Sequence, residues 1–131
     1  MIEETNNSDV VEEILARFKA YNTALDAGDA EALNGFFWNS PSTVRFGPTE
    51  TLFGIESIAA FRLGKWKGPA MSREIVRVAV TAFGRDAATT NALFRSANGK
   101  VSRQSQTWAR FPEGWKIAAA HVSAAPDEGA A

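Results

Sequence analysis

The chain of 131 residues contains no cysteine, one histidine and one tyrosine, and its formal net charge at pH 7 is −1. The absence of cysteine excludes disulfides, thiolate nucleophiles and zinc–thiolate sites. A single histidine excludes centres that need two or three imidazoles, and we expect neither a metal nor a cofactor. With 14 basic and 15 acidic residues there is no global basic field, so nucleic acid is not an expected partner.

Long apolar runs are also missing. No stretch approaches the roughly 20 residues of a membrane span, and residues 1–8 lack the pattern of a signal peptide, so we expect a cytoplasmic protein with no membrane contact. The chain is 45% hydrophobic and 11% aromatic, which is enough to build a core. We predict a single domain over residues 9–123, between a disordered N-terminus (1–8) and a flexible tail (124–131).

Helical spacing dominates the first part of the sequence. Apolar residues three and four positions apart predict an amphipathic helix over 10–26, with Asp9 as its N-cap. Gly28 is expected to end this helix in a left-handed conformation, and Asp29 to cap a second, short helix. A third helix is expected after Gly54.

Strands dominate the rest of the sequence. Turn signals, among them Asn98-Gly99, separate runs rich in β-branched and aromatic residues. Helices followed by a meander predict an α+β fold, in which three N-terminal helices pack on a strongly curved mixed or antiparallel sheet and leave a cavity. The predicted strands cover residues 43–46, 51–53, 74–83, 88–95, 100–111 and 115–123.

Two polar residues lie where a cavity could use them. Tyr21 is on the inward stripe of the first helix, so it is either a core tyrosine bonded to a carbonyl or a proton donor. Arg45 stands between Val44 and Phe46 in a short strand, and alternation puts it on the face opposite to them. Its ordinary place is solvent; inside a cavity it would be a permanent cation whose planar donors match a carboxylate.

Three further residues are weaker candidates for lining the cavity. His121 falls in register with Ile117 on the last strand and is interpreted as a neutral histidine in a wall, or as a ligand contact. Gln104 shares a strand face with Gln106 and either holds a urea or carboxylate group or meets water. Trp38 closely precedes the strand that holds Arg45, and we expect it at the lip of the cavity.

Other polar residues are expected to be solvated or are absent from the interior. The Asp residues fall at helix ends, in turns or in the tail, which weakens an isomerase that relies on an Asp base. No Ser lies in a nucleophile elbow, and no glycine-rich loop could cradle a phosphate. The arginines expected on solvated faces are Arg62, Arg73, Arg77, Arg95, Arg103 and Arg110.

Several runs together carry a resemblance to a known family. They are Tyr21-Asn22-Thr23-Ala24-Leu25, Phe37-Trp38, Thr43-Val44-Arg45-Phe46-Gly47, Leu52-Phe53-Gly54, Ala60-Phe61-Arg62, Phe83-Gly84-Arg85-Asp86, Gln104-Ser105-Gln106-Thr107-Trp108, Phe111-Pro112-Glu113-Gly114-Trp115 and Ala120-His121-Val122-Ser123. From about residue 9 to 123 the chain resembles the AtzH-like branch (DUF3225), related to the oxalurate-catabolism protein HpxZ, of the nuclear transport factor 2-like (NTF2-like, SnoaL-like) superfamily.

The resemblance implies a cone-shaped α+β fold, a homodimer, and a role beside amidases in the catabolism of nitrogen compounds such as cyanuric acid or oxalurate. It also implies similarity to a cofactor-independent decarboxylating amidohydrolase that converts 1,3-dicarboxyurea to allophanate. In that family a tyrosine on the first helix and an arginine on the first strand are needed for activity. They match Tyr21 and Arg45.

These implications lead to a mechanistic expectation and two alternatives. Tyr21 gives a proton to the nitrogen that loses CO2, Arg45 clamps the carboxylate that stays, and Trp38, Gln104 and His121 contact a small carboxylated amide or urea. One alternative is a noncatalytic ligand-binding protein that assists a partner amidase. The second alternative is a ketosteroid-isomerase-like enzyme.

Overall fold

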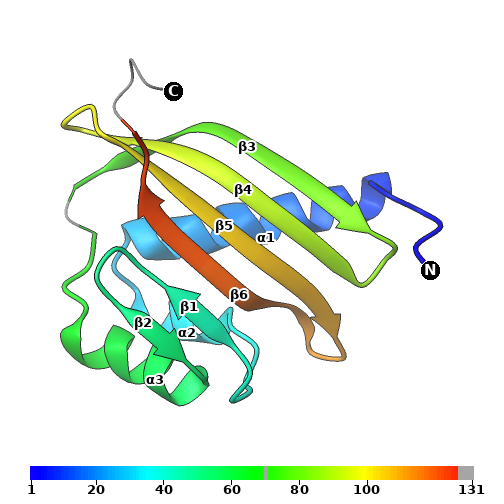
Figure 1. Ribbon diagram of the computed structural model, residues 1–131, viewed down its shortest axis with the longest axis horizontal. Helices are drawn as coiled ribbons and strands as arrows, with labels where there is room; N and C mark the ends of the chain where they lie inside the picture. The colour runs from blue at the N-terminus through cyan, green and yellow to red at the C-terminus, as the bar shows by residue number, and fades with distance from the viewer. Residues whose placement is uncertain (70, 127–131) are drawn as a thin grey trace.

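The computed structural model describes residues 1–69 and 71–126 and shows helices packed on one six-stranded sheet (Figure 1). Among these residues no helix is long and apolar enough to cross a bilayer. The elements in chain order are α1 (Ser8–Asp26), α2 (Ala30–Gly35), β1 (Val44–Phe46), β2 (Thr51–Phe53), α3 (Ile55–Ala60), the π-helix η1 (Phe61–Lys65), β3 (Arg73–Phe83), β4 (Ala87–Ser96), β5 (Val101–Phe111) and β6 (Gly114–Ala124).

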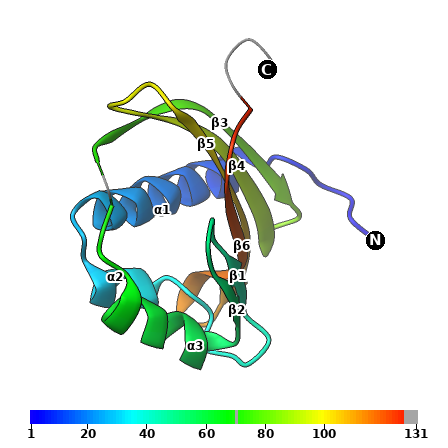
Figure 2. The same ribbon diagram turned by 60° about the vertical axis from the view of Figure 1, so that its left-hand side comes forward.

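The sheet is mixed and curved. Its strand order is β2-β1-β6-β5-β4-β3, with β1 parallel to β6 and the other neighbours antiparallel. Figure 2 shows the sheet bending around α1, with α2 and α3 gathered at one end. The predicted fold class, three N-terminal helices on a strongly curved sheet, is therefore confirmed.

The apolar stripe of α1 fixes the helix to the sheet. Val10, Ile14, Phe18 and Tyr21 are all buried, at the spacing of three and four residues that one helix face requires. Trp108 on β5 is fully buried in the same core. Burying a large apolar side chain contributes roughly 1.5–3 kcal/mol, so this stripe holds Tyr21 in one place against the sheet.

The N-cap of α1 is Asn7, not the expected Asp9. The Asn7 side-chain oxygen accepts hydrogen bonds from the backbone N–H groups of Asp9 and Val10, at 3.1 and 3.2 Å. The helix therefore starts earlier than the apolar stripe does, because the polar residues before Val10 already adopt helical geometry. At the other end Gly28 has φ +70° and the Asp29 side chain caps α2, both as predicted.

The chain termini pair with the sheet. Within the segment 1–8, the backbone N–H of Asn6 donates to the Ala82 carbonyl on β3 at 2.9 Å. In the predicted tail, Ala124 belongs to β6 and the Ala125 N–H donates to Val101 at 2.9 Å. Residues 127–131 lie outside the described residues.

A bulge in β6 changes which side chains face inward. Thr107 pairs with Ala119 while Trp108 pairs with Ile117, so Ala118 is an extra residue. After this residue the alternation shifts by one position. His121 therefore does not share the inward face of Ile117, contrary to the register expected from strict alternation.

Asn7→Ala should lower the free energy of unfolding by about 1 kcal/mol, because two backbone N–H groups lose their acceptor. Asp9→Glu keeps the charge in the first turn and replaces a residue that could cap a helix with one that caps poorly. Because Asn7 is the actual cap, this change should alter the free energy of unfolding by less than about 0.5 kcal/mol. Urea titrations of both variants check this. A larger loss for Asp9→Glu than for Asn7→Ala would restore Asp9 as the cap.

Candidate functional site

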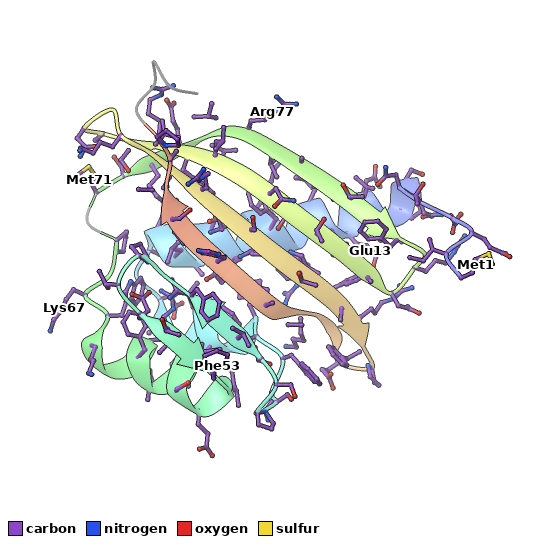
Figure 3. The ribbon with its side chains drawn as sticks, in the orientation of Figure 1. Met1, Glu13, Phe53, Lys67, Met71 and Arg77 are labelled. Atoms are coloured by element: carbon purple, nitrogen blue, oxygen red, sulfur yellow. The ribbon has the colours of Figure 1, made fainter. Side chains whose placement is uncertain are left out.

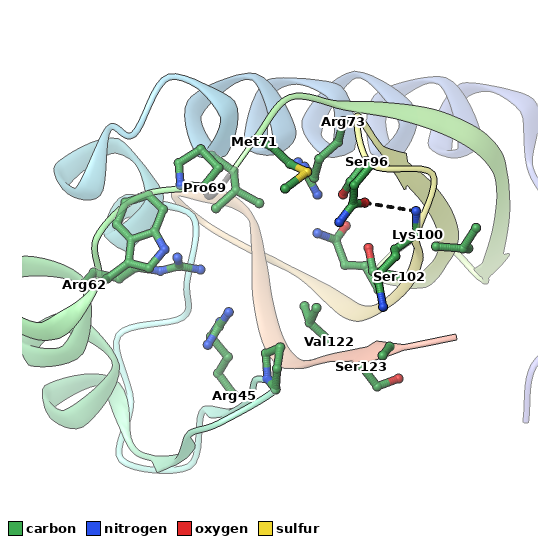
Figure 4. A pocket seen from close by; sticks show the side chains of 17 residues that line it. Arg45, Arg62, Pro69, Met71, Arg73, Ser96, Lys100, Ser102, Val122 and Ser123 are labelled. Carbon is green, nitrogen blue, oxygen red and sulfur yellow. Dashed lines mark hydrogen bonds between the residues drawn. The ribbon is translucent and has the colours of Figure 1, made fainter. Parts of the chain in front are cut away.

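A pocket of about 430 Å³ opens between the C-terminal end of α1, the π-helix and the ends of the long strands (Figure 4). Four cationic side chains line it, and none of the carboxylates in residues 1–69 and 71–126 does. The lining residues are Leu25, Arg45, Pro48, Arg62, Trp66, Pro69, Met71, Arg73, Ser96, Asn98, Lys100, Val101, Ser102, Gln104, Val122, Ser123 and Ala124.

Arg45 points into this pocket from β1. Its residue is only 6% exposed, so the ordinary expectation that it lies in solvent is wrong. In the parallel pairing with β6 it lies opposite Ala120, which is small and buried. The apolar neighbour Phe46 takes the outer face and contacts His121 edge-on, with ring centroids 5.8 Å apart.

Glu50 neutralises Arg45. Its carboxylate accepts a hydrogen bond from Arg45 Nη1 at 2.5 Å, and both side chains are largely buried. Burial by itself raises the pKa of Glu50, but hydrogen bonds from Arg45 and Thr49 and the charge of Arg45 outweigh it, so the pKa lies below its usual value. Gly47 makes the pair possible, since a Cβ atom there would overlap the Glu50 carboxylate.

Arg62 and Arg73 were both expected on solvated faces, but both line the pocket, and the Arg73 side chain is only 13% exposed. Arg62 is buried more deeply, at 2% exposed. It follows Ile58 by four positions, so it continues the buried face of α3 into the wide turn of the π-helix, where the Trp66 N–H bonds to Phe61 O.

The guanidinium of Arg62 has few partners for a buried cation. Nη2 donates to the Tyr21 hydroxyl at 3.0 Å, and the group lies over the Trp66 ring with its central carbon 4.7 Å from the centroid. Among the described residues Nε and Nη1 have no hydrogen-bond partner. Burial, together with the positive charge of Arg45, lowers the pKa of Arg62 from its usual value, while Tyr21 and Glu50 oppose this shift.

Tyr21 stands behind Arg62. Its ring packs edge-on against Phe36 and Phe37, with centroid distances of 5.5 and 6.1 Å, and the residue is 2% exposed. The hydroxyl accepts the Arg62 hydrogen bond but is not itself part of the pocket lining. Arg45 thus lines the pocket directly, whereas Tyr21 is connected to the same pocket through its hydrogen bond with Arg62.

The charges around the pocket do not balance. Arg45 is paired with Glu50, and Arg73 on β3 is paired with Asp26, with a nitrogen–oxygen distance of 2.9 Å. Over the described part of the chain, Arg62 has no ion pair. The inner end of the pocket therefore carries one uncompensated buried positive charge. No group of three or more metal-ligating side chains is found among the same residues.

Gln104 lines the pocket and is held in place by a neighbouring amide. It exchanges two amide hydrogen bonds with Asn22 on α1, at 3.1 and 3.3 Å. The Asn22 oxygen also accepts from Arg73 at 3.1 Å. Asn22 and Gln104 therefore form a polar wall that joins α1 to β5 and fixes the orientation of both amides.

Two of the predicted substrate contacts lie away from this pocket. His121 is exposed on the outer face, because the bulge at Ala118 shifts the alternation of β6. Trp38 stacks on Phe111 with ring centroids 5.2 Å apart and lines a different cleft near α2 and α3. Trp38 precedes Arg45 in sequence, but the turn between them places it beside Ile117, three positions before the β6 residue that pairs with Arg45.

Glu50→Gln should lower the free energy of unfolding by about 1–3 kcal/mol near pH 7, because buried Arg45 loses its counter-charge. The folded pKa of Glu50 lies below the unfolded value of about 4.3. The stabilisation is therefore present above that pH and is lost as the pH falls through the folded pKa. Denaturation curves from pH 7 to 3 should show the two proteins converging, whereas Glu3→Gln, at an exposed site, should match wild type throughout.

The chain is similar to proteins of one known family. The AtzH-like family model matches residues 3–128. No curated protein matches the chain. A structure from Pectobacterium atrosepticum, described as a DUF3225 family protein of unknown function, is 38% identical with a TM-score of 0.89, covering 96% of this chain and 98% of that one.

Two other solved structures have the same architecture. A cystatin-like fold protein from Burkholderia xenovorans is 44% identical with a TM-score of 0.87, over 92% of this chain and 95% of that one. A putative ketosteroid isomerase from Parabacteroides distasonis is 20% identical with a TM-score of 0.75, over 97% and 96%, and shows the fold alone. The chain belongs to the AtzH-like family of NTF2-like proteins.

Proposed function

We propose that this protein is a cofactor-independent decarboxylating amidohydrolase of nitrogen-compound catabolism, acting on an N-carboxylated urea of the 1,3-dicarboxyurea type and releasing allophanate. The observation that carries the proposal is the cationic pocket, in which Arg45 and Arg62 point toward one another with no lining carboxylate among the described residues (Figure 4). Such a pocket selects small anions. The proposed type of reaction is taken from the resemblance to the AtzH-like family.

The proposed reaction requires only two things of the protein, a positive charge that binds the substrate and one proton donor. The bond between a terminal carboxylate carbon and the urea nitrogen breaks, and CO2 departs without its electron pair. That pair stays on the nitrogen, which takes up one proton to give the amide of allophanate. Tyr21 supplies the proton and regains one from water, so no redox partner is required.

The roles of the two residues follow from their positions. Arg45 binds the carboxylate that stays, since an arginine on the departing carboxylate would favour the ground state and oppose departure. Tyr21 lies behind Arg62 and does not line the pocket, so the reacting nitrogen has to lie next to that guanidinium to receive the phenolic proton. The hydrogen bond from Arg62 to the phenolic oxygen stabilises the anion left after proton transfer.

A noncatalytic binding protein that assists an amidase is the second candidate. It is favoured by one observation, that the Gln104 amide in the pocket wall is held by Asn22 rather than free for chemistry. Release of CO2 by the purified protein alone separates the two. A ketosteroid-isomerase-like reaction is disfavoured, because none of the described lining residues is an Asp or Glu base. Homodimer formation and the link to an amidase stay predictions.

Tyr21→Phe should reduce kcat for CO2 release from 1,3-dicarboxyurea by about 10²–10⁴-fold, the usual contribution of a general acid. Arg45→Met should mainly raise KM, because it removes a contact made before and during the reaction. Arg77→Met, at an exposed arginine that projects from β3 (Figure 3), is the control and should behave as wild type. Wild-type kinetics in folded Tyr21→Phe would remove Tyr21 from the mechanism.

A further inference from the structure

The guanidinium of Arg62 is a buried cation with unused hydrogen-bond donors. It is buried beside a pocket, and two of its three nitrogens, Nε and Nη1, have no partner among the described residues. Buried donors are normally satisfied by protein or water, and buried charges are normally paired. Here the carboxylates nearest in the network are already engaged, Glu50 by Arg45 and Asp26 by Arg73.

The remaining contacts of Arg62 do not neutralise it. Tyr21 offers a neutral phenolic oxygen to Nη2, and Trp66 offers the face of its ring. Arg45 lies at the same end of the pocket, as Figure 4 shows, but its charge is already paired with Glu50 and brings Arg62 no negative charge. A group with this cost is retained where a ligand supplies the missing negative charge.

We propose that Arg62 binds the negative charge of the substrate directly and is a third functional residue of this pocket beside Tyr21 and Arg45. The inference rests on the proposed function for the identity of the anion. The anion binding itself does not depend on turnover. The ligand class is a small flexible dicarboxylate, whose retained carboxylate meets Arg45 and whose reacting end meets Arg62.

The same guanidinium serves every stage of the reaction. Before bond breaking, the charge is on the carboxylate that departs. As CO2 leaves, the charge moves to the urea nitrogen, and after proton transfer it resides on the Tyr21 oxygen, which already accepts a hydrogen bond from Arg62 Nη2. An arginine that held only the departing carboxylate would oppose its departure. Arg62 lies next to the nitrogen and the phenolic oxygen as well, so it holds the charge equally well before and after CO2 leaves.

Glutarate is the probe that separates binding from chemistry. Its five-carbon chain has the length of 1,3-dicarboxyurea, and it has no N-carboxylate to lose. By calorimetry the wild-type protein should bind glutarate, and Arg62→Met should weaken the affinity by about 10-fold or more, the effect of losing charge-assisted hydrogen bonds. Arg62→Lys should recover part of the affinity. Arg77→Met, with the same change in net charge, should leave it unchanged.

Neutral glutaramide and thermal melting complete the test. Glutaramide should bind equally weakly to wild type and Arg62→Met, since the variant removes a charge contact. The Tm of Arg62→Met should stay close to that of wild type, because removing an unpaired buried cation offsets the loss of the hydrogen bond to the buried Tyr21 hydroxyl. An unchanged glutarate affinity, or no binding by wild type, would overturn the proposal, as would a drop in Tm that accounts for the lost affinity.

The outcome for Arg62 is separable from the outcome for the proposed reaction. If wild type releases no CO2 from 1,3-dicarboxyurea but glutarate binding depends on Arg62, the reaction fails and the anion site stands. If CO2 is released at the same kcat and KM by Arg62→Met, the reaction stands and Arg62 is not part of it.

Discussion

The hydrogen bond between Arg62 and Tyr21 is the contact on which the organisation of the pocket depends. It joins α1 to the π-helix, 41 residues further along the chain, inside the protein. Tyr21 is placed by the core stripe of α1, and Arg62 by continuation of the face that Ile58 buries. Neither polar group reaches water easily, so each constrains the other. The donors that remain on Arg62 are left for the pocket.

The strand β1 shows how the fold reverses the usual distribution of polar and apolar side chains. Arg45 is buried while Phe46 lies on the outer face beside His121, and Phe53 on β2 is 66% exposed (Figure 3). This arrangement is stable because Glu50 neutralises Arg45 within the same hairpin and Gly47 leaves room for the carboxylate. The hairpin is therefore a unit that carries a charge into the interior at low cost.

Much of the fold was predictable because its signals are local. Helical spacing over 10–26, the left-handed Gly28 and the hairpin turns each depend on a few neighbouring residues, and the structure has them. The register of the strands was harder to predict. The extra residue Ala118 has no distinctive side chain, so alternation placed His121 on the inward face, whereas the bulge turns it outward. Asn7 was missed as a cap because the helix begins before its apolar stripe.

The site was predictable only in part, for a different reason. Periodicity left Arg45 and Tyr21 undecided, and only a family resemblance favoured them. Arg62 was overlooked although its spacing from Ile58 was visible, because an arginine is usually solvated and that prior outweighed a single helical interval. The role of a buried arginine can be inferred only when its ion-pair and hydrogen-bond partners are known from the structure. In this pocket two of the three arginines have carboxylates, and the third has a phenol.

The division of charges supports the selectivity for small anions that is proposed for the pocket. A site made only of paired arginines would be neutral and would distinguish ligands by shape, while a site of unpaired arginines would be too costly to fold. Among the described residues Arg62 is the buried arginine of this pocket that lacks a carboxylate, while Arg45 and Arg73 are paired, so the cost of an unpaired buried arginine falls on a single group. Its charge lies at the end of the pocket next to Tyr21. In the proposed reaction, anion binding and proton transfer therefore involve the same end of the ligand.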